Sequence, residues 1–250
     1  MNRVIVFAAQ QFLGFELCKS LLEYGYEVEG FDEGEQGEKW LEIGRNANVN
    51  YAAYPFQQKE EKITHMVFPY FDYEEGHHES LTKEIKGIEP MEDIHFHFLF
   101  STHMLSKRYK EEHIDLTKVI EKLNIKNKTS IIYLPTVYGP SQPANYLYAS
   151  ILNNNHEEIS IEGLRDDPED VLFVRDVANT FVHQLDKEGV YLYVSNKEKE
   201  WERGISELTD IDVQLSPLNF IRSYVQQKEV IPSSISIKEG LRLQEKSYQD

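Results

Sequence analysis

The N-terminal segment of the chain constrains its fold most strongly. Val4–Ala9 is an unbroken apolar run of strand length, which is typical of a strand that is covered on both faces of a parallel sheet. Leucines then recur at helical spacing over residues 15–24, and Gly25 follows where a helix favours glycine at its C-cap. Alternating residues over 26–32 indicate a second strand. This order of elements predicts a right-handed parallel crossover.

The same alternation continues along the chain. Further strands are expected near residues 63–68, 94–100, 130–134, 171–174 and 191–194, and helices near 38–45, 104–123, 176–186 and 203–209. The pattern predicts an α/β protein with a doubly wound parallel sheet of the Rossmann type and a smaller interwoven C-terminal lobe. We expect residues 1–150 to form the dinucleotide-binding region and residues 151–250 a substrate-side lobe of the same structural unit. The acidic stretch 72–93 predicts a loop excursion.

Composition excludes several classes of partner. The 250 residues include 43 Asp and Glu against 26 Lys and Arg, a formal net charge of −17, which disfavours contact with nucleic acid or anionic lipid. Cys18 is the single cysteine, so no internal disulfide forms and a reducing compartment is expected. The apolar N-terminal run is shorter than a signal-peptide core or a membrane span. We therefore expect a cytoplasmic protein without nucleic-acid or membrane partners.

A family resemblance is carried by the turn after the first strand, Phe7-Ala8-Ala9-Gln10-Gln11-Phe12-Leu13-Gly14. It is similar to the Thr-Gly-x-x-Gly-Phe-Ile-Gly turn of the extended short-chain dehydrogenase/reductase superfamily, also called the NAD-dependent epimerase/dehydratase family. Phe12, Leu13 and Gly14 match that pattern, whereas Ala8 and Gln11 replace its first two glycines. Three later segments also resemble segments of the family, and they occur in the same order. They are Leu134-Pro135-Thr136-Val137-Tyr138-Gly139-Pro140, 170–177 and 237–241.

The resemblance implies that the first turn binds the pyrophosphate of NAD. In the family, backbone N–H groups of this turn and of the following helix approach the phosphates, and glycines leave room for that approach. The residues carried over to this role are Ala8, Gln11, Phe12, Leu13 and Gly14. Gln11 places a long side chain where the family has only backbone, so any dinucleotide binding is expected to be weak.

Other cofactor contacts are implied further along the chain. Asp32 ends the second predicted strand, from which a carboxylate accepts hydrogen bonds from the adenosine ribose and favours NAD over NADP. The alternative interpretation is a solvated carboxylate at a strand end. Pro69, after the fourth strand, and Pro135 and Val137, after the sixth, lie where the family lines its cofactor.

Catalytic residues are implied at the end of the fifth strand. The family uses a Ser or Thr there and a Tyr-x-x-x-Lys pair on the next helix, in which Tyr exchanges a proton and Lys holds the ribose. Ser101 matches the serine, and His103 stands four residues before Lys107 in place of Tyr. Tyr109, four residues before His113, offers a second alignment of the pair. The alternative is that Ser101 and Thr102 only cap a helix start.

Substrate and metal expectations follow from single positions. Glu169 stands where nucleotide-sugar members carry an arginine, which disfavours a substrate with a diphosphate.

His95 and His97 lie on the same face of a buried strand with no cysteine or carboxylate in ligand spacing, so we expect ordinary core histidines and no metal.

Two functions remain open from the sequence. The first is NAD-dependent redox, epimerase or dehydratase chemistry on a small substrate. The second is a non-catalytic relative that senses a nucleotide or binds a protein, because fold alone does not decide function. Helices after the catalytic segment pair about a two-fold axis in the family, so helix 104–123 implies a homodimer.

Overall fold

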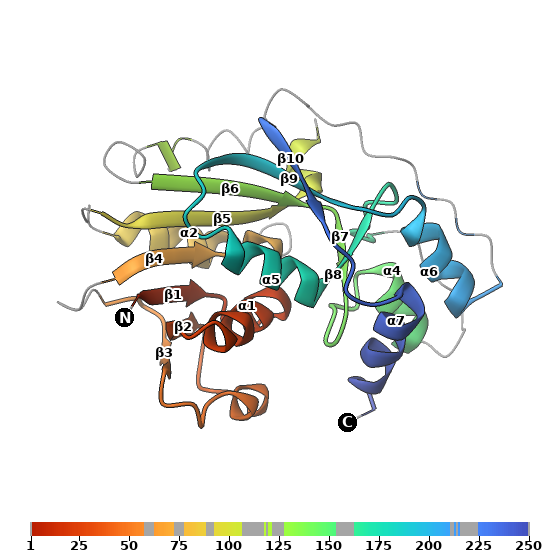
Figure 1. The fold of residues 1–250 in the computed structure, drawn as a ribbon. Coiled ribbons are helices and arrows are strands. Elements are labelled where there is room, and N and C mark those ends of the chain that lie inside the picture. Colours follow the sequence, from red (N-terminus) through yellow and green to blue (C-terminus); the bar gives the residue numbers. More distant parts are fainter. Residues whose placement is uncertain are drawn as a thin grey trace.

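The central sheet is parallel throughout. The computed structural model describes residues 2–57, 63–72, 78–88, 93–106, 118, 120–121, 128–153, 163–210, 213, 215 and 225–249. Within these residues eight strands form the order β10-β9-β6-β5-β4-β1-β2-β3. Their bounds are β1 Arg3–Phe7, β2 Glu27–Asp32, β3 Val49–Ala53, β4 Ile63–Phe68, β5 His95–Ser101, β6 Lys128–Leu134, β9 Gly189–Ser195 and β10 Gln227–Ile231. Because neighbouring strands run parallel, their C-terminal ends share one edge (Figure 1).

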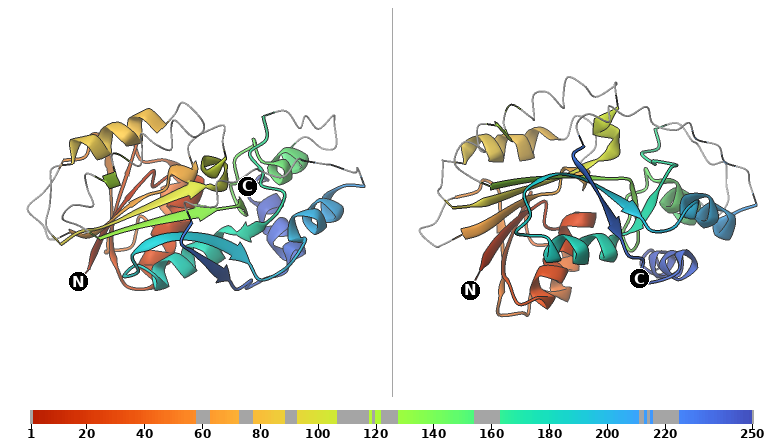
Figure 2. Two further views of the ribbon diagram at one scale, coloured as in Figure 1. Left: turned by 90° about the horizontal axis from the view of Figure 1, so that it is seen from above. Right: turned by 45° about the horizontal axis from the view of Figure 1, so that its top comes forward.

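Helices cover both faces of this sheet. α1 (Phe12–Glu23) and α5 (Val174–His183) lie on one face, and α2 (His78–Gly87) lies on the other (Figure 2). Short 3-10 helices follow three of the strands: η1 (Glu38–Glu42), η2 (Tyr70–Asp72) and η3 (Thr102–Leu105). The result is the doubly wound arrangement that the sequence predicts.

The apolar run in β1 explains why the sheet is buried on both sides. Val4 and Val6 pack into the core under α1 and α5, whereas Ile5 and Phe7 pack into the core under α2. All four side chains are fully buried. Side chains alternate across a strand, so a strand between two helical layers needs an apolar residue at every position.

A smaller lobe stands at the C-terminal ends of the strands. It contains the parallel pair β7 (Thr136–Tyr138) and β8 (Val171–Phe173), with α4 (Leu147–Asn153), α6 (Glu200–Leu208) and α7 (Ile237–Lys246) packed around a third core (Figure 1). β9 and β10 come from the same half of the chain but extend the main sheet. The two halves are therefore interwoven.

Several local expectations need correction. The acidic stretch 72–93 contains helix α2, whose Leu81 and Ile85 are buried against the sheet, so a loop excursion was wrong for its central part. The expected helix at 104 does not begin there, because residues 102–105 form η3 and Ser106 is extended. Residues 107–117 lie outside the described part of the chain. β3, β7, β10 and α4 were not predicted, since each has only three to seven residues, and α7 was not predicted either.

Cys18 is buried and free, as the sequence indicates. The described helices are too short or too polar to cross a membrane.

Gly14→Ala is expected to lower the free energy of unfolding by roughly 1–3 kcal/mol. A Cβ at Gly14 would lie 2.0 Å from the carbonyl oxygen of Ala8, so the backbone of the first turn would have to move. Urea denaturation measures the effect. Gly87→Ala is the control, because a Cβ there meets nothing within 4 Å. Equal stability of the two variants would show that the turn is not close-packed.

Candidate functional site

The turn between β1 and α1 is tight although it lacks two of the expected glycines. Ala8 adopts φ +50°, in the left-handed region that favours glycine. The N–H of Gln11 donates to the carbonyl of Ala8 at 3.0 Å and closes the turn. The side chains of Phe12 and Leu13 are buried in the core, and Gln11 is exposed. The turn thus presents its backbone N–H groups at the start of α1.

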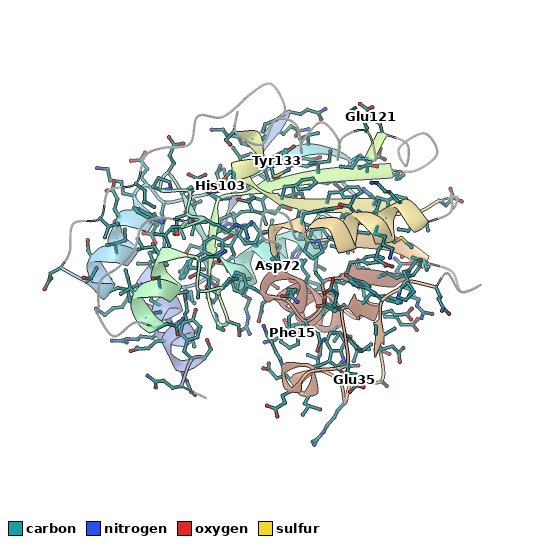
Figure 3. The ribbon with its side chains drawn as sticks, turned by 180° about the vertical axis from the view of Figure 1, so that it is seen from behind. Phe15, Glu35, Asp72, His103, Glu121 and Tyr133 are labelled. Carbon is teal, nitrogen blue, oxygen red and sulfur yellow. The ribbon has the colours of Figure 1, made fainter. Side chains whose placement is uncertain are left out.

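Asp72 occupies the N-terminus of α1. Its Oδ1 accepts the N–H of Leu13 at 2.7 Å, and its Oδ2 accepts the N–H of Gly14 at 2.8 Å. These donors have no partner within the helix and form the position where helices bind anions. Figure 3 shows Asp72 at the end of α1, between the sheet and the C-terminal lobe. A carboxylate of the protein therefore fills the place that the resemblance gives to pyrophosphate.

Local structure places Asp72 there. Pro69 follows β4 and is buried, and η2 folds back so that the N–H of Asp72 donates to the Pro69 carbonyl at 3.2 Å. Tyr70 and Phe71 are buried on either side of the chain and anchor η2 in the two main cores. Burial raises the pKa of the Asp72 carboxyl to about 7, although the N–H groups of Leu13 and Gly14 and the charge of Lys39 lower it.

Asp32 also binds the turn rather than solvent. Its Oδ2 accepts the N–H of Gln10 at 2.8 Å, its Oδ1 accepts the N–H of Glu33 at 2.8 Å, and the side-chain amide of Gln11 lies 3.4 Å from Oδ2. The residue is buried. Burial raises the pKa of Asp32, and these hydrogen bonds oppose that shift. Its carboxylate is thus already used inside the protein.

Two more side chains complete the turn. The hydroxyl of Tyr54, just after β3, accepts the N–H of Ala8 at 3.1 Å. The side-chain amide of Gln10 donates to the Tyr51 hydroxyl at 2.7 Å and to the Glu35 carbonyl at 3.2 Å. Together with Asp32 and Asp72, Tyr54 thus provides acceptors for four backbone N–H groups of the turn, those of Ala8, Gln10, Leu13 and Gly14. The turn as it stands does not fit the pyrophosphate of NAD.

The predicted catalytic residues are only partly brought together. Ser101 caps η3 by accepting the N–H of His103 at 3.3 Å, so the capping alternative describes its observed contact. The hydroxyl of Thr102 donates to Asp167 at 2.8 Å, and Nε2 of His103 lies 3.3 Å from the carbonyl of Asp166. Lys107 and Tyr109 lie outside the described residues. Proton transfer by this group stays a prediction.

A cavity of about 370 Å³ opens beside this segment, at the C-terminal ends of β5, β6 and β9. Thr102 and Pro135 line it, whereas Val137 is fully buried in the core. The charged groups at its wall are the carboxylates of Asp167, Glu169, Asp170 and Glu198 and the amines of Lys197 and Lys228. Burial raises the pKa of both Asp167 and Asp170 to about 6. The wall is therefore acidic on balance at neutral pH.

Sequence reasoning missed most of the residues that form hydrogen bonds with the turn between β1 and α1. Asp72 lies in a segment that looked irregular, and nothing in its neighbourhood indicates a partner near residue 14. Gln10 and Tyr54 lie in loops whose contacts depend on how β1, β2 and β3 pair. Only Asp32 had a recognisable signal, since it ends a strand at the predicted distance from the turn.

Comparison with known proteins finds the fold but no close relative. No family model matches the chain, and no curated protein matches it by sequence. A point mutant of UDP-glucuronic acid 4-epimerase from Bacillus cereus, in complex with UDP-4-deoxy-4-fluoro-glucuronic acid and NAD, is 15% identical, with a TM-score of 0.68 and 99% of each chain covered. dTDP-glucose 4,6-dehydratase from Bacillus anthracis, in complex with NAD, is 15% identical with a TM-score of 0.66, covering 100% of this chain and 97% of that one.

A third similar structure is UDP-glucose 4-epimerase from Thermotoga maritima with UDP-glucose, 16% identical, with a TM-score of 0.60, covering 100% of this chain and 99% of that one. The chain thus has the fold of the NAD-dependent epimerases and dehydratases over its whole length. This confirms the fold that the sequence resemblance predicts. At these identities the likeness concerns the fold alone.

Asp72→Asn is expected to change how stability depends on pH. Because the pKa of Asp72 is about 7 in the folded protein and 3.8 as its ordinary value, the folded state binds the proton more tightly. The wild type should therefore lose stability relative to Asp72→Asn as pH rises from about 4 to about 7, by at most ~1.4 kcal/mol per pH unit. Urea denaturation at several pH values measures the difference. Asp93→Asn, at an exposed residue, is the control, and parallel curves for Asp72→Asn and wild type would contradict the assignment.

Proposed function

We propose that this protein is a non-catalytic relative of the NAD-dependent epimerases and dehydratases that binds a small polar molecule in the cavity beside β5, β6 and β9. The observation that carries the proposal is the pair of hydrogen bonds from Leu13 and Gly14 to Asp72. They replace the contacts on which a bound dinucleotide depends. In this proposal the protein keeps the fold and does not perform redox chemistry with NAD.

Electrostatics supports the exclusion of a pyrophosphate. A dinucleotide placed on the α1 N-terminus would bring its negative phosphates against Asp72, and above the pKa of this carboxyl group, about 7, like charges at contact distance repel. Displacing Asp72 would leave a partly buried carboxylate without its two N–H donors. An uncompensated buried polar group costs roughly 1–3 kcal/mol, and more if it is charged. The charge repulsion and the loss of these hydrogen bonds therefore both oppose the binding of NAD.

The cavity indicates which ligands suit it. Its wall has an excess of carboxylates, and each oxygen of Asp167 and Asp170 accepts one hydrogen bond from the protein. A carboxylate oxygen can accept more than one, so hydroxyl or amino groups of a ligand suit this wall. Glu169 replaces the expected arginine and lines the same cavity. We infer that the ligand carries hydroxyl or amino groups and no diphosphate.

The proposal includes a cytoplasmic location. It leaves the homodimer as a prediction, because the helix expected at 104–123 lies mostly outside the described residues. It also leaves open whether Lys107 and Tyr109 contact the ligand, for the same reason.

Titration with NAD tests the proposal most simply. We expect no thermal stabilisation of the wild type at about millimolar NAD, whereas a ligand at 100 times its Kd adds about 2.7 kcal/mol. Asp72→Ala frees the N–H groups of Leu13 and Gly14 and should tighten NAD binding by about tenfold or more, equivalent to ~1.4 kcal/mol. Gln11→Gly is expected to give a smaller gain, because its side chain is exposed. Isothermal titration calorimetry measures each affinity.

Asp210→Ala is a matched control, since Asp210 is exposed and follows α6. If Asp72→Ala fails to fold, Asp72→Asn serves, because it removes the charge and keeps the shape. Micromolar NAD binding by the wild type, unimproved by either Asp72 variant, would overturn the proposal. Stabilisation of the wild type by UDP-glucose would overturn the inference that the ligand lacks a diphosphate.

A further inference from the structure

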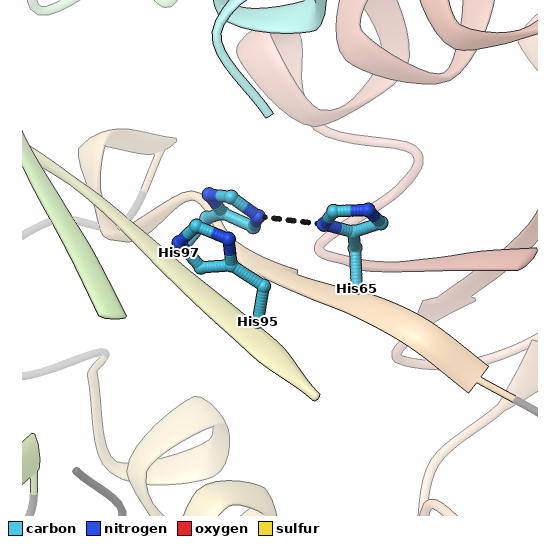
Figure 4. A group of neighbouring side chains, drawn as sticks. All are labelled: His65, His95 and His97. Carbon is cyan, nitrogen blue, oxygen red and sulfur yellow. Dashed lines mark hydrogen bonds between the residues drawn. The ribbon is translucent and has the colours of Figure 1, made fainter. Parts of the chain in front are cut away.

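Three histidines meet at the opposite edge of the sheet, near the N-terminal ends of the strands. His65 belongs to β4, and His95 and His97 belong to β5. The parallel register pairs His65 with His95 across the two strands. All three are buried, and Figure 4 shows His95 and His97 one over the other, with His65 facing them from the neighbouring strand. The proposed ligand cavity does not include them.

A serine determines which ring nitrogens carry protons. The hydroxyl of Ser130, in β6, donates its single proton to the carbonyl of Lys187 at 2.9 Å. Its oxygen lies 3.0 Å from Nε2 of His95 and 2.9 Å from Nδ1 of His97, so it accepts from both. A hydroxyl has one proton and two acceptor lone pairs. Nε2 of His95 and Nδ1 of His97 are therefore both protonated.

The other two nitrogens then carry lone pairs. Neutral imidazole has one protonated nitrogen, which leaves Nδ1 of His95 and Nε2 of His97 unprotonated. Nε2 of His97 accepts a hydrogen bond from Nδ1 of His65 at 3.1 Å. Burial lowers the pKa of all three histidines, that of His95 to about 4. The cluster is therefore neutral at physiological pH.

We propose that His65, His95 and His97 bind a divalent transition-metal ion of the zinc class. One nitrogen from each residue lies within 4.8 Å of the others. Zinc–nitrogen bonds of ~2.0–2.1 Å in tetrahedral geometry separate two ligand atoms by about 3.3 Å, close to the 3.1 Å between His65 and His97. Neutral imidazole is the form that coordinates such ions.

Ser130 has the role that hydrogen-bond acceptors play around metal-bound histidines. Such acceptors take the second N–H of the ring and so fix its tautomer and orientation. Here one hydroxyl, held by the Lys187 carbonyl, does this for His95 and His97 together. Two structural changes accompany binding. His65 moves its proton from Nδ1 to Nε2, and the stacked rings of His95 and His97, 4.2 Å apart at their centroids, open towards the ion.

The ligand set defines the chemical class of the ion. Three imidazoles suit zinc, cobalt, nickel or copper, whereas magnesium and calcium need oxygen ligands. Three histidines leave the fourth tetrahedral position for a water molecule. Among the described residues, no cysteine or carboxylate joins the group.

Metal titration of untagged, chelator-treated protein tests the proposal. We expect one equivalent of Zn²⁺ to bind by calorimetry with a Kd in the micromolar range or below. Co²⁺ should give the visible absorption of a tetrahedral site. Mg²⁺ is expected to give no binding. His65→Gln should weaken Zn²⁺ binding by more than tenfold, whereas His183→Gln, at an exposed histidine on α5, should leave it unchanged.

Ser130→Ala keeps all three imidazoles and loses only the group that fixes their tautomers, and such changes typically cost 10–100-fold in metal affinity. It also serves as the second variant if His65→Gln does not fold. Absence of Zn²⁺ and Co²⁺ binding at millimolar concentration would overturn the proposal. So would Zn²⁺ binding that both His65→Gln and Ser130→Ala leave unchanged.

Discussion

The contact between the Asp72 carboxylate and the first turn of α1 is the interaction on which the rest of the site depends. It joins residues 58 positions apart and fixes η2 against the helix. A helix N-terminus needs acceptors for its free N–H groups. In dinucleotide-binding folds the phosphates of the ligand supply them, and in this protein a side chain does. The N–H groups of Leu13 and Gly14 therefore have their acceptor within the chain.

The same principle recurs around the turn. Asp32 accepts the N–H of Gln10, and Tyr54 accepts that of Ala8. The backbone N–H groups of Ala8, Gln10, Leu13 and Gly14 thus each have an acceptor within the chain. The cavity beside β9 differs, because it remains open and carries a mixed but mainly acidic wall. In our proposal the protein keeps the fold and binds another ligand, which agrees with the general rule that one fold supports many functions.

The spacing of apolar residues predicted the fold well, because it indicates which side chains of a strand or helix are buried. Strand β1 is predicted by its apolar run alone, and the tight turn after it by the segment that ends at Gly14. The state of the site depends on contacts between distant segments. Asp72 reaches Gly14 only through the fold, and His65 and Ser130 join His95 and His97 only when β4, β5 and β6 pair in register. A sequence pattern that showed two histidines on one strand could not reveal the third or the serine that orients them.

Amide resonances of Leu13 and Gly14 in a ¹⁵N–¹H correlation spectrum test the central claim most directly. If Asp72 accepts both N–H groups, these two resonances move with pH, with a midpoint at the pKa of Asp72, about 7. They should lose this response in Asp72→Asn and stay in place when NAD is added to the wild type. Resonances that are insensitive to pH but shift with NAD would contradict the account, because the α1 N-terminus would then be free to bind phosphate.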